Sequence, residues 1–236
     1  MKTILITGGN RGIGLGLVKE FLKDKDVTSI FATTRDAEKS AELQEISDSR
    51  LHIIEMDVTK AMSIKYAFKE VKSKLGDQPL NILINNSGIL TNYKMDGPVD
   101  KMSIIDQFKV NAVGPLMVTQ VFLPLVKKAK EGKIVNISST LGSIANAQGS
   151  AFRETLPYAM TKSALNQFTK GLSVDLKEDP ITVVSFCPGW VQTDMGTADA
   201  IIPVDESVAD LKKSILKLKK SHSGGFYTRT LETIPY

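Results

Sequence analysis

Short apolar runs alternate along the chain with longer stretches in which apolar and polar residues recur at helical spacing. The runs are rich in β-branched residues and nearly unbroken in apolarity, as strands covered on both faces of a sheet are. Strands are expected at "TILIT" (3–7), "SIFATT" (29–34), "LHIIEM" (51–56), "NILIN" (81–85), "KIVNIS" (133–138) and "TVVSFC" (182–187), with a weaker one at "GGFYT" (224–228). Helices are expected at about 12–23, 36–47, 60–75, 102–130, 157–178 and 205–220.

Strands and helices that take turns in this way indicate βαβ units and a parallel sheet. We therefore predict an α/β fold, a doubly wound Rossmann-fold domain with a mainly parallel sheet of about seven strands. The 236 residues, 42% of them hydrophobic, suffice for one sizeable core, and no linker rich in proline, glycine and serine divides them. A single domain over residues 1–236 is expected.

Charge and cysteine content narrow the function classes only slightly. A net charge of +4 is small, so we expect no nucleic-acid partner. No run approaches the roughly 20 apolar residues of a spanning helix, and the start of the chain lacks the apolar stretch of a signal peptide, so we expect no membrane partner and a cytoplasmic location. The one cysteine, Cys187, excludes an intrachain disulfide, and with only two histidines beside it we expect no metal site.

A glycine-rich turn, "TGGNRGIG", follows the first expected strand at residues 7–14. Gly8, Gly12 and Gly14 fall within seven residues. Between a first strand and a first helix, such a turn is where the doubly wound fold holds the pyrophosphate of a dinucleotide. A structural turn without a ligand is the alternative. A phosphate P-loop is not indicated, because no Gly-Lys-Ser/Thr sequence follows.

Two further stretches carry candidate chemistry. Tyr158 and Lys162, in "YAMTK", share one face of a helix, where the ammonium would lower the pKa of the phenol and let it exchange a proton with a carbonyl oxygen. Ser139 ends "KIVNISS" at the crevice edge of the sheet, where its hydroxyl can hydrogen-bond a substrate. Two solvated side chains and a turn-capping serine are the alternatives. A serine hydrolase is not indicated, because G-x-S-x-G is absent.

The stretch "FATTRD" bears on the choice of cofactor. Enzymes that use NADH place an acid at the end of the second strand, on the ribose 2′-hydroxyl. Thr34 takes that position here, Arg35 follows it, and Arg11 in the glycine turn adds a second cation. Arginine binds a 2′-phosphate in a fork, whereas Asp36, one residue further on, would repel it. The sequence predicts NADPH/NADP+ as the cofactor.

Taken in order, the motifs resemble the short-chain dehydrogenase/reductase family over most of the chain. They comprise the T-G-x-x-x-G-x-G turn at 7–14, Asp57-Val58, Asn85-Asn86-Ser87-Gly88, Asn111, "NISS" at 136–139, Tyr158-x-x-x-Lys162, and Cys187-Pro188-Gly189 followed by Thr193. Within the family the chain is similar to the sniffer-type carbonyl reductases. It departs from the usual N-N-A-G at Ser87, and its gap from Ser139 to Tyr158 is long, which makes their geometry depend on an inserted loop.

The resemblance implies a role for each matching residue. Tyr158 would protonate the carbonyl oxygen, Lys162 would lower its pKa and hold the nicotinamide ribose, and Ser139 would orient the carbonyl, with Ser138 as the second choice. Asn111 would bend its helix and hold a water of the proton relay, although from the sequence alone a satisfied polar side chain is favoured. The implied cofactor-binding residues are Gly8, Asn10, Arg11, Gly12, Ile13, Gly14, Arg35, Asp57, Val58, Asn85, Gly88, Tyr158, Lys162, Pro188, Gly189, Val191 and Thr193.

The expected function is NADPH-dependent reduction of ketones, aldehydes or quinones. An NADP(H)-binding regulator with little activity is the alternative. The loop "TLGSIANAQGSAFRETLP" (140–157), together with residues 191–203, is expected to wall the substrate site and to favour bulky carbonyls. A remote surface insertion is the other interpretation of this loop. Family members often form homodimers through the helices around 102–130 and 157–178, and some are monomers, so the sequence leaves the assembly open.

Overall fold

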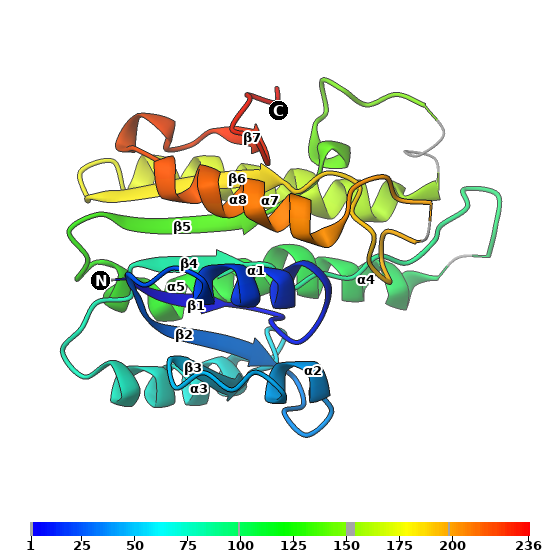
Figure 1. The fold of residues 1–236 in the computed structure, drawn as a ribbon. Coiled ribbons are helices and arrows are strands. Elements are labelled where there is room, and N and C mark those ends of the chain that lie inside the picture. The colour runs from blue at the N-terminus through cyan, green and yellow to red at the C-terminus, as the bar shows by residue number, and fades with distance from the viewer. Residues whose placement is uncertain (1, 99, 150–153, 198) are drawn as a thin grey trace.

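The computed structural model describes residues 2–98, 100–149, 154–197 and 199–236. Seven parallel strands within them form one sheet in the order β3-β2-β1-β4-β5-β6-β7 (Figure 1). They are β1 (Lys2–Ile6), β2 (Val27–Thr34), β3 (Leu51–Glu55), β4 (Ile82–Asn85), β5 (Gly132–Ile137), β6 (Ile181–Cys187) and β7 (Phe226–Thr228). The predicted strands and the doubly wound α/β fold are thereby confirmed.

Helices cover both faces of this sheet, as the unbroken apolarity of the strands requires. They are α1 (Gly12–Leu22), α2 (Ala41–Gln44), α3 (Ala61–Leu75), α4 (Lys101–Phe108), α5 (Gly114–Val126), α7 (Leu156–Asp175) and α8 (Val204–Lys217). Along β1, Ile4 and Ile6 pack in the core beneath α1 and α8, whereas Leu5 packs on the other face with α3 and α5 (Figure 1).

Two expected helices differ from the prediction. The helix expected at 36–47 is reduced to α2, because the hydroxyl of Ser40 and the carboxylate of Asp36 bond to backbone groups in the first half of that stretch. The helix expected at 102–130 ends at Val126 and is divided by a π-helical turn, η1 (Lys109–Val113), between α4 and α5.

The run from Lys101 to Val126 also bears on the membrane prediction, because its length and composition would allow it to cross a bilayer. Its most apolar window of 18 residues has a mean hydropathy of 1.3, and 44% of that window is buried inside the protein. Val118, Phe122 and Leu125 are among the core residues of the run. Packing against the sheet therefore accounts for much of its apolarity.

The order of the strands fixes where a ligand can bind. From β1 the chain moves outward through β2 to β3, then crosses to β4 on the other side of β1. The crossover connections leave a crevice at the carboxyl ends of β1 and β4, which is where open α/β sheets bind their ligands. The glycine-rich turn follows β1, and Asn86-Ser87-Gly88 follows β4, so both motifs lie at this crevice.

Candidate active site

The glycine-rich turn is shaped for a group that approaches the backbone closely. Gly8 and Gly12 have φ angles of +65° and +53°, in the left-handed region that favours glycine. A Cβ at Gly14 would overlap the carbonyl oxygen of Gly8. No side chain of the described residues caps the first turn of α1, which leaves its N–H groups directed at the crevice. This arrangement fits a pyrophosphate, and Asn10 and Ile13 belong to the same turn.

Contacts with the two neighbouring strands hold the turn in place. The Thr7 hydroxyl accepts bonds from the N–H groups of Asn86 at 2.9 Å and Ser87 at 3.0 Å. Asn86 in turn donates from Nδ2 to the carbonyl of Gly8 at 3.1 Å. On the other side, Gly9 donates to the carbonyl of Thr33 at 2.8 Å. Neither Gly9 nor a separate role for Asn86 could be predicted from the sequence, since only the folded turn shows what each one touches.

The end of β2 offers a cation where a 2′-phosphate is expected. Arg35 is exposed, and Thr34 is buried with its hydroxyl 3.0 Å from that of Ser40. The carboxylate of Asp36 is bound to Lys39 at 3.0 Å. The acid that would oppose a phosphate is therefore already paired with a lysine.

The second predicted cation, Arg11, is held by a residue that is distant in the sequence. Its guanidinium forms an ion pair with the carboxylate of Asp194 at 2.8 Å, and both side chains are exposed. Arg11 thus lies at the crevice as predicted, but with a partner that the sequence did not indicate.

Residues after β3 and β4 border the same crevice to different degrees. Asp57 accepts bonds from the backbone and hydroxyl of Thr59, and Val58 is buried. Gly88 lies against the ammonium of Lys162, 3.8 Å from where its Cβ would be. The side chain of Asn85 does not reach the crevice, because it is buried and donates to Thr119 at 3.0 Å and to Asn136 at 2.8 Å.

Tyr158 and Lys162 lie one turn apart on α7, and both are buried. The Lys162 Nζ is 5.4 Å from the centroid of the Tyr158 ring and donates to the carbonyl of Ile137 at 2.7 Å. Burial lowers the pKa of Lys162 from 10.5 to about 8. At neutral pH this residue still carries an ammonium beside the phenol.

The pKa of Tyr158 differs from our expectation in direction. Burial raises it above its ordinary value, the nearby Cys187 raises it further, and a side-chain hydrogen bond with Ser139 opposes both. We expected the neighbouring ammonium to lower this pKa, but the desolvation of a fully buried phenolate outweighs that attraction. The phenol is therefore neutral at physiological pH, which is the form that donates a proton.

Ser139 is held by the turn that follows it, which is bonded to α7. It begins a short 3₁₀ turn, η2 (Thr140–Gly142), and its hydroxyl accepts from the N–H of Leu141 at 3.2 Å. The carbonyl of Gly142 accepts from Ser163 at 3.1 Å and from Asn166 at 3.2 Å, both on α7. A Cβ on Gly142 would lie 2.8 Å from the Lys162 backbone. The first residues of the loop, as far as Gly142, are thus fixed directly on α7.

Ser138, the second choice, lies one residue earlier and is buried. Among the described residues its hydroxyl has no hydrogen-bond partner. The bond to Tyr158 distinguishes Ser139 from it.

Asn111 joins three segments around the site. It is fully buried in η1, accepts at Oδ1 from the N–H of Ile89 at 2.8 Å, and donates from Nδ2 to the carbonyl of Ile89 and to Thr161. The favoured interpretation of a satisfied polar side chain matches these bonds. The π-helical turn is the local bend that the resemblance implied, and π-turns concentrate at functional positions.

The segment after β6 lies next to the glycine turn. Gly189 has a φ of +86°, and the carbonyl of Pro188 accepts from Ser207 at 2.8 Å. Val191 is buried and pairs with Ile202 in a short parallel bridge. The Thr193 methyl is 3.3 Å from where a Cβ of Gly12 would be. Of the four residues predicted here, Thr193 thus contacts the glycine turn directly.

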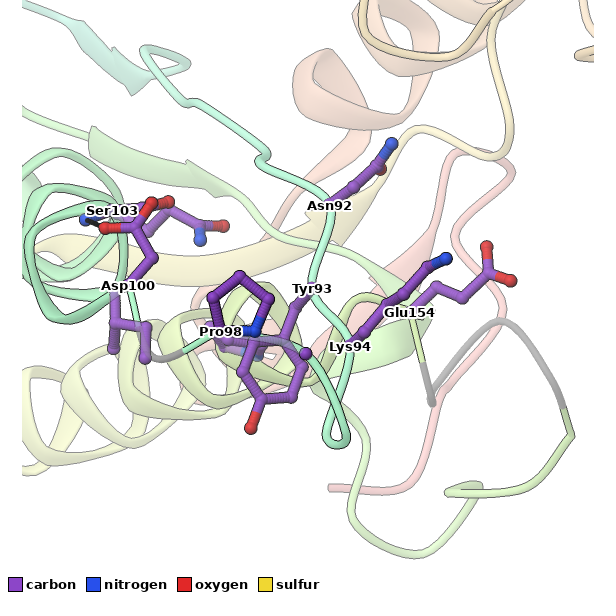
Figure 2. Close-up of a pocket in the computed structure, with 11 residues that line it drawn as sticks. Asn92, Tyr93, Lys94, Pro98, Asp100, Ser103 and Glu154 are labelled. Carbon is purple, nitrogen blue, oxygen red and sulfur yellow. Dashed lines mark hydrogen bonds between the residues drawn. The ribbon is translucent and has the colours of Figure 1, made fainter.

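A cavity of about 370 Å³ adjoins the N-terminus of α7 (Figure 2). Figure 2 shows Tyr93 and Pro98 in the middle of its lining, with Lys94 and Glu154 on one side and Asp100 and Ser103 on the other. The loop that we expected to wall the substrate site contributes Glu154 and Pro157, while its residues 150–153 lie outside the described part. Most of the lining comes from residues 92–107, which were not singled out from the sequence, and none from the described residues of 191–203.

These parts allow one kind of chemistry together. A neutral buried phenol, a hydroxyl bonded to it and an ammonium lie beside a crevice that fits a dinucleotide, so a proton can be delivered to an oxygen as a hydride reaches the carbon bound to it. Among the described residues no group of His, Cys, Asp and Glu side chains could hold a metal ion.

Comparisons with known proteins agree with this arrangement. The family model described as short chain dehydrogenase matches residues 2–200. An uncharacterized oxidoreductase of Schizosaccharomyces pombe is 35% identical over 261 residues, which cover 100% of this chain and 98% of the relative. The structure of the carbonyl reductase Sniffer of D. melanogaster superposes with a TM-score of 0.95 at 35% identity, over 100% of both chains. An NADPH-bound carbonyl reductase from chicken fatty liver gives a TM-score of 0.94 at 35% identity, over 100% of this chain and 99% of that one.

Proposed function

The chain belongs to the short-chain dehydrogenase family, and on that premise we propose that it is an NADPH-dependent carbonyl reductase. The observation that supports this proposal most directly is the buried pair on α7, in which the Lys162 Nζ lies 5.4 Å from the centroid of the Tyr158 ring. NADPH-bound and other carbonyl reductases are among its structural relatives, and its own glycine turn and cations fit that cofactor.

In the proposed reaction a carbonyl compound becomes an alcohol. NADPH, when bound, would supply the hydride that adds to the carbonyl carbon, and NADP+ would be the oxidised product. Tyr158 donates the proton that the carbonyl oxygen needs, and the Ser139 hydroxyl hydrogen-bonds the same oxygen and keeps it in line with the phenol. The two electrons of the hydride and the one proton complete the C–H and O–H bonds of the product.

Lys162 has two proposed tasks. Its ammonium stabilises the phenolate that remains after proton transfer, and its N–H groups would hold the nicotinamide ribose. Gly8, Asn10, Gly12, Ile13 and Gly14 would bind the pyrophosphate through their backbone. The remaining proposed cofactor contacts are Arg11, Arg35, Asp57, Val58, Gly88, Pro188, Gly189, Val191 and Thr193. For Asn85 only the backbone is left for such a contact, since its amide is used inside the core.

A screen of ketones, aldehydes and quinones with NADPH, followed by the loss of nicotinamide absorbance, tests the proposal. Turnover of at least one class is expected. Tight NADPH binding without turnover of any carbonyl would instead favour the alternative, a cofactor-binding regulator.

The choice of NADPH over NADH gives a testable prediction at Arg35. We expect Arg35→Asp to lower kcat/KM with NADPH relative to NADH by at least about tenfold, because the fork that binds the 2′-phosphate is replaced by a charge that repels it. Steady-state kinetics with both cofactors would measure this ratio. Lys25 precedes the first residue of β2, at the end of the strand opposite Arg35. Lys25→Asp makes the same charge change there and serves as the control. An unchanged ratio in Arg35→Asp would contradict the assignment.

The cavity beside α7 supports a substrate site for bulky or aromatic carbonyls. Its lining joins Pro157, the neighbour of Tyr158, to Tyr93, whose N–H donates to the carbonyl of Glu154 at 2.9 Å. We propose that the body of the substrate packs against Tyr93.

Tyr93→Ala is then expected to lower kcat/KM for bulky aromatic ketones about tenfold and to change that for small ketones less than twofold, since aromatic contact area is lost only for the larger substrates. Kinetics on a ketone series would check this. Tyr66→Ala, at an exposed tyrosine of α3, is the matched control. Equal losses for small and bulky ketones would place the substrate elsewhere.

The assembly and location of the protein are also proposals. Exposed apolar side chains on α4, η1, α5 and α7 support pairing into a homodimer through these helices: Met102, Val113, Leu116 and Met160. We further propose a cytoplasmic location, where Cys187, buried and unpaired in the structure, remains reduced.

A further inference from the structure

Residues 188–197 leave the end of β6 and reach the glycine turn, far away in the sequence. The contact is made at two points, by the Thr193 methyl against Gly12 and by the carboxylate of Asp194 on the guanidinium of Arg11 at 2.8 Å. One side of this contact is the predicted cofactor turn, and the other belongs to the wall of the crevice.

Internal bonds hold Asp194 in its position. The Trp190 indole donates to the carbonyl of Gly196 at 2.6 Å, and the Thr193 hydroxyl accepts from the N–H of Gly196 at 3.1 Å. The N–H of Thr197 donates to the carbonyl of Thr193 at 2.9 Å. Asp194 therefore stands at the tip of a tight turn, where it presents a negative charge to Arg11.

The segments that carry Arg11 and Arg35 are joined by a backbone hydrogen bond. The bond from Gly9 to the carbonyl of Thr33 fixes the glycine turn on the end of β2, two residues from each arginine. In this fold a cation near that point accommodates the 2′-phosphate of NADP(H). Asp194 consequently places a carboxylate next to the group that would bind a phosphate.

We propose that Asp194 is a specificity-determining residue, whose carboxylate competes with the 2′-phosphate of the cofactor for the guanidinium of Arg11. The inference rests on the proposed NADPH dependence. An exposed ion pair such as Arg11–Asp194 is weak, so a phosphate can displace it. The displaced carboxylate then remains close to the phosphate and repels it. Asp194 thus lowers the affinity for NADPH and leaves that for NADH, which has no 2′-phosphate, unchanged.

The test is equilibrium binding, without turnover. Titrations followed by the fluorescence of the reduced nicotinamide give the Kd of NADPH and NADH for the wild type and for Asp194→Asn, which keeps the size of the side chain. We expect the Kd of NADPH to fall about three- to tenfold and that of NADH to change less than twofold. Asp199→Asn removes a charge five residues further along and should change neither.

The double variant separates a direct effect from a general one. If Asp194 acts through Arg11, Asp194→Asn gives a clearly smaller gain for NADPH in an Arg11→Ala background than in the wild type. Equal gains in both backgrounds, an equal change for NADPH and NADH, or the same gain from Asp199→Asn would each overturn the inference. So would unchanged Kd values in Asp194→Asn, if the wild type prefers NADPH. A wild type that does not prefer NADPH would instead overturn the proposed function.

Discussion

Tyr158→Phe is expected to lower kcat for carbonyl reduction by at least about 100-fold, because it removes the only atom that this residue can use to donate a proton. The raised pKa keeps this phenol protonated in the resting site, and the Ser139 bond directs it. Since one oxygen is lost from a ring that is otherwise packed, the fold and the Kd of NADPH should stay nearly unchanged. Kinetics and cofactor titration on the same preparation measure both.

Tyr227→Phe is the matched control for this variant. Tyr227 is partly buried, and its hydroxyl also forms a hydrogen bond, to the carbonyl of His222 at 3.2 Å, but it stands on β7. The Tyr227→Phe variant should have a kcat close to that of the wild type. Near-normal turnover in Tyr158→Phe would place the proton donor elsewhere.

Lys162→Met has the second large expected effect, and it acts on two measurements at once. The loss of the ammonium should raise the Kd of NADPH at least about tenfold, since hydrogen bonds from a charged group are lost, and should lower kcat about 100-fold. Lys133→Met is the control, because Lys133 also donates to a backbone carbonyl, that of Ile215 at 2.8 Å, and its pKa is also lowered by burial. An unchanged Kd in Lys162→Met would remove this residue from the cofactor site.

The same lysine predicts how cofactor binding depends on pH. Burial lowers the pKa of Lys162 to about 8, so the ammonium is present below that pH and is lost as the pH rises through it. NADPH binding by the wild type should therefore weaken above about pH 8. The corresponding decline should be absent in Lys162→Met and retained in Lys133→Met. Cofactor titrations at several pH values between 6.5 and 9.5 would extend about one pH unit or more beyond the transition on either side.

Much of the fold could be predicted from local patterns. Each strand is a short apolar run bounded by polar or turn-forming residues, and such a run is stable only when a sheet buries it. The glycine turn was also predictable, because Gly8 and Gly12 adopt φ angles that other residues rarely take. Helix lengths were predicted less well: side-chain bonds of Asp36 and Ser40 shorten α2, and nothing in the local pattern marks the π-turn at Asn111.

The candidate site divides in the same way. The sequence alone indicated which residues are candidates for the chemistry, because Tyr158 and Lys162 share a helix face and Ser139 ends a buried strand. Only the tertiary structure decided the pKa values of these residues and the contacts that hold them in place. The clamp of Gly142 by Ser163 and Asn166, the inward turn of Asn85, and the pairing of Arg11 with Asp194 join residues far apart in the chain. The raised pKa of Tyr158 likewise follows from complete burial, because the desolvation of a charge depends on everything packed around it and not on the neighbouring residues alone.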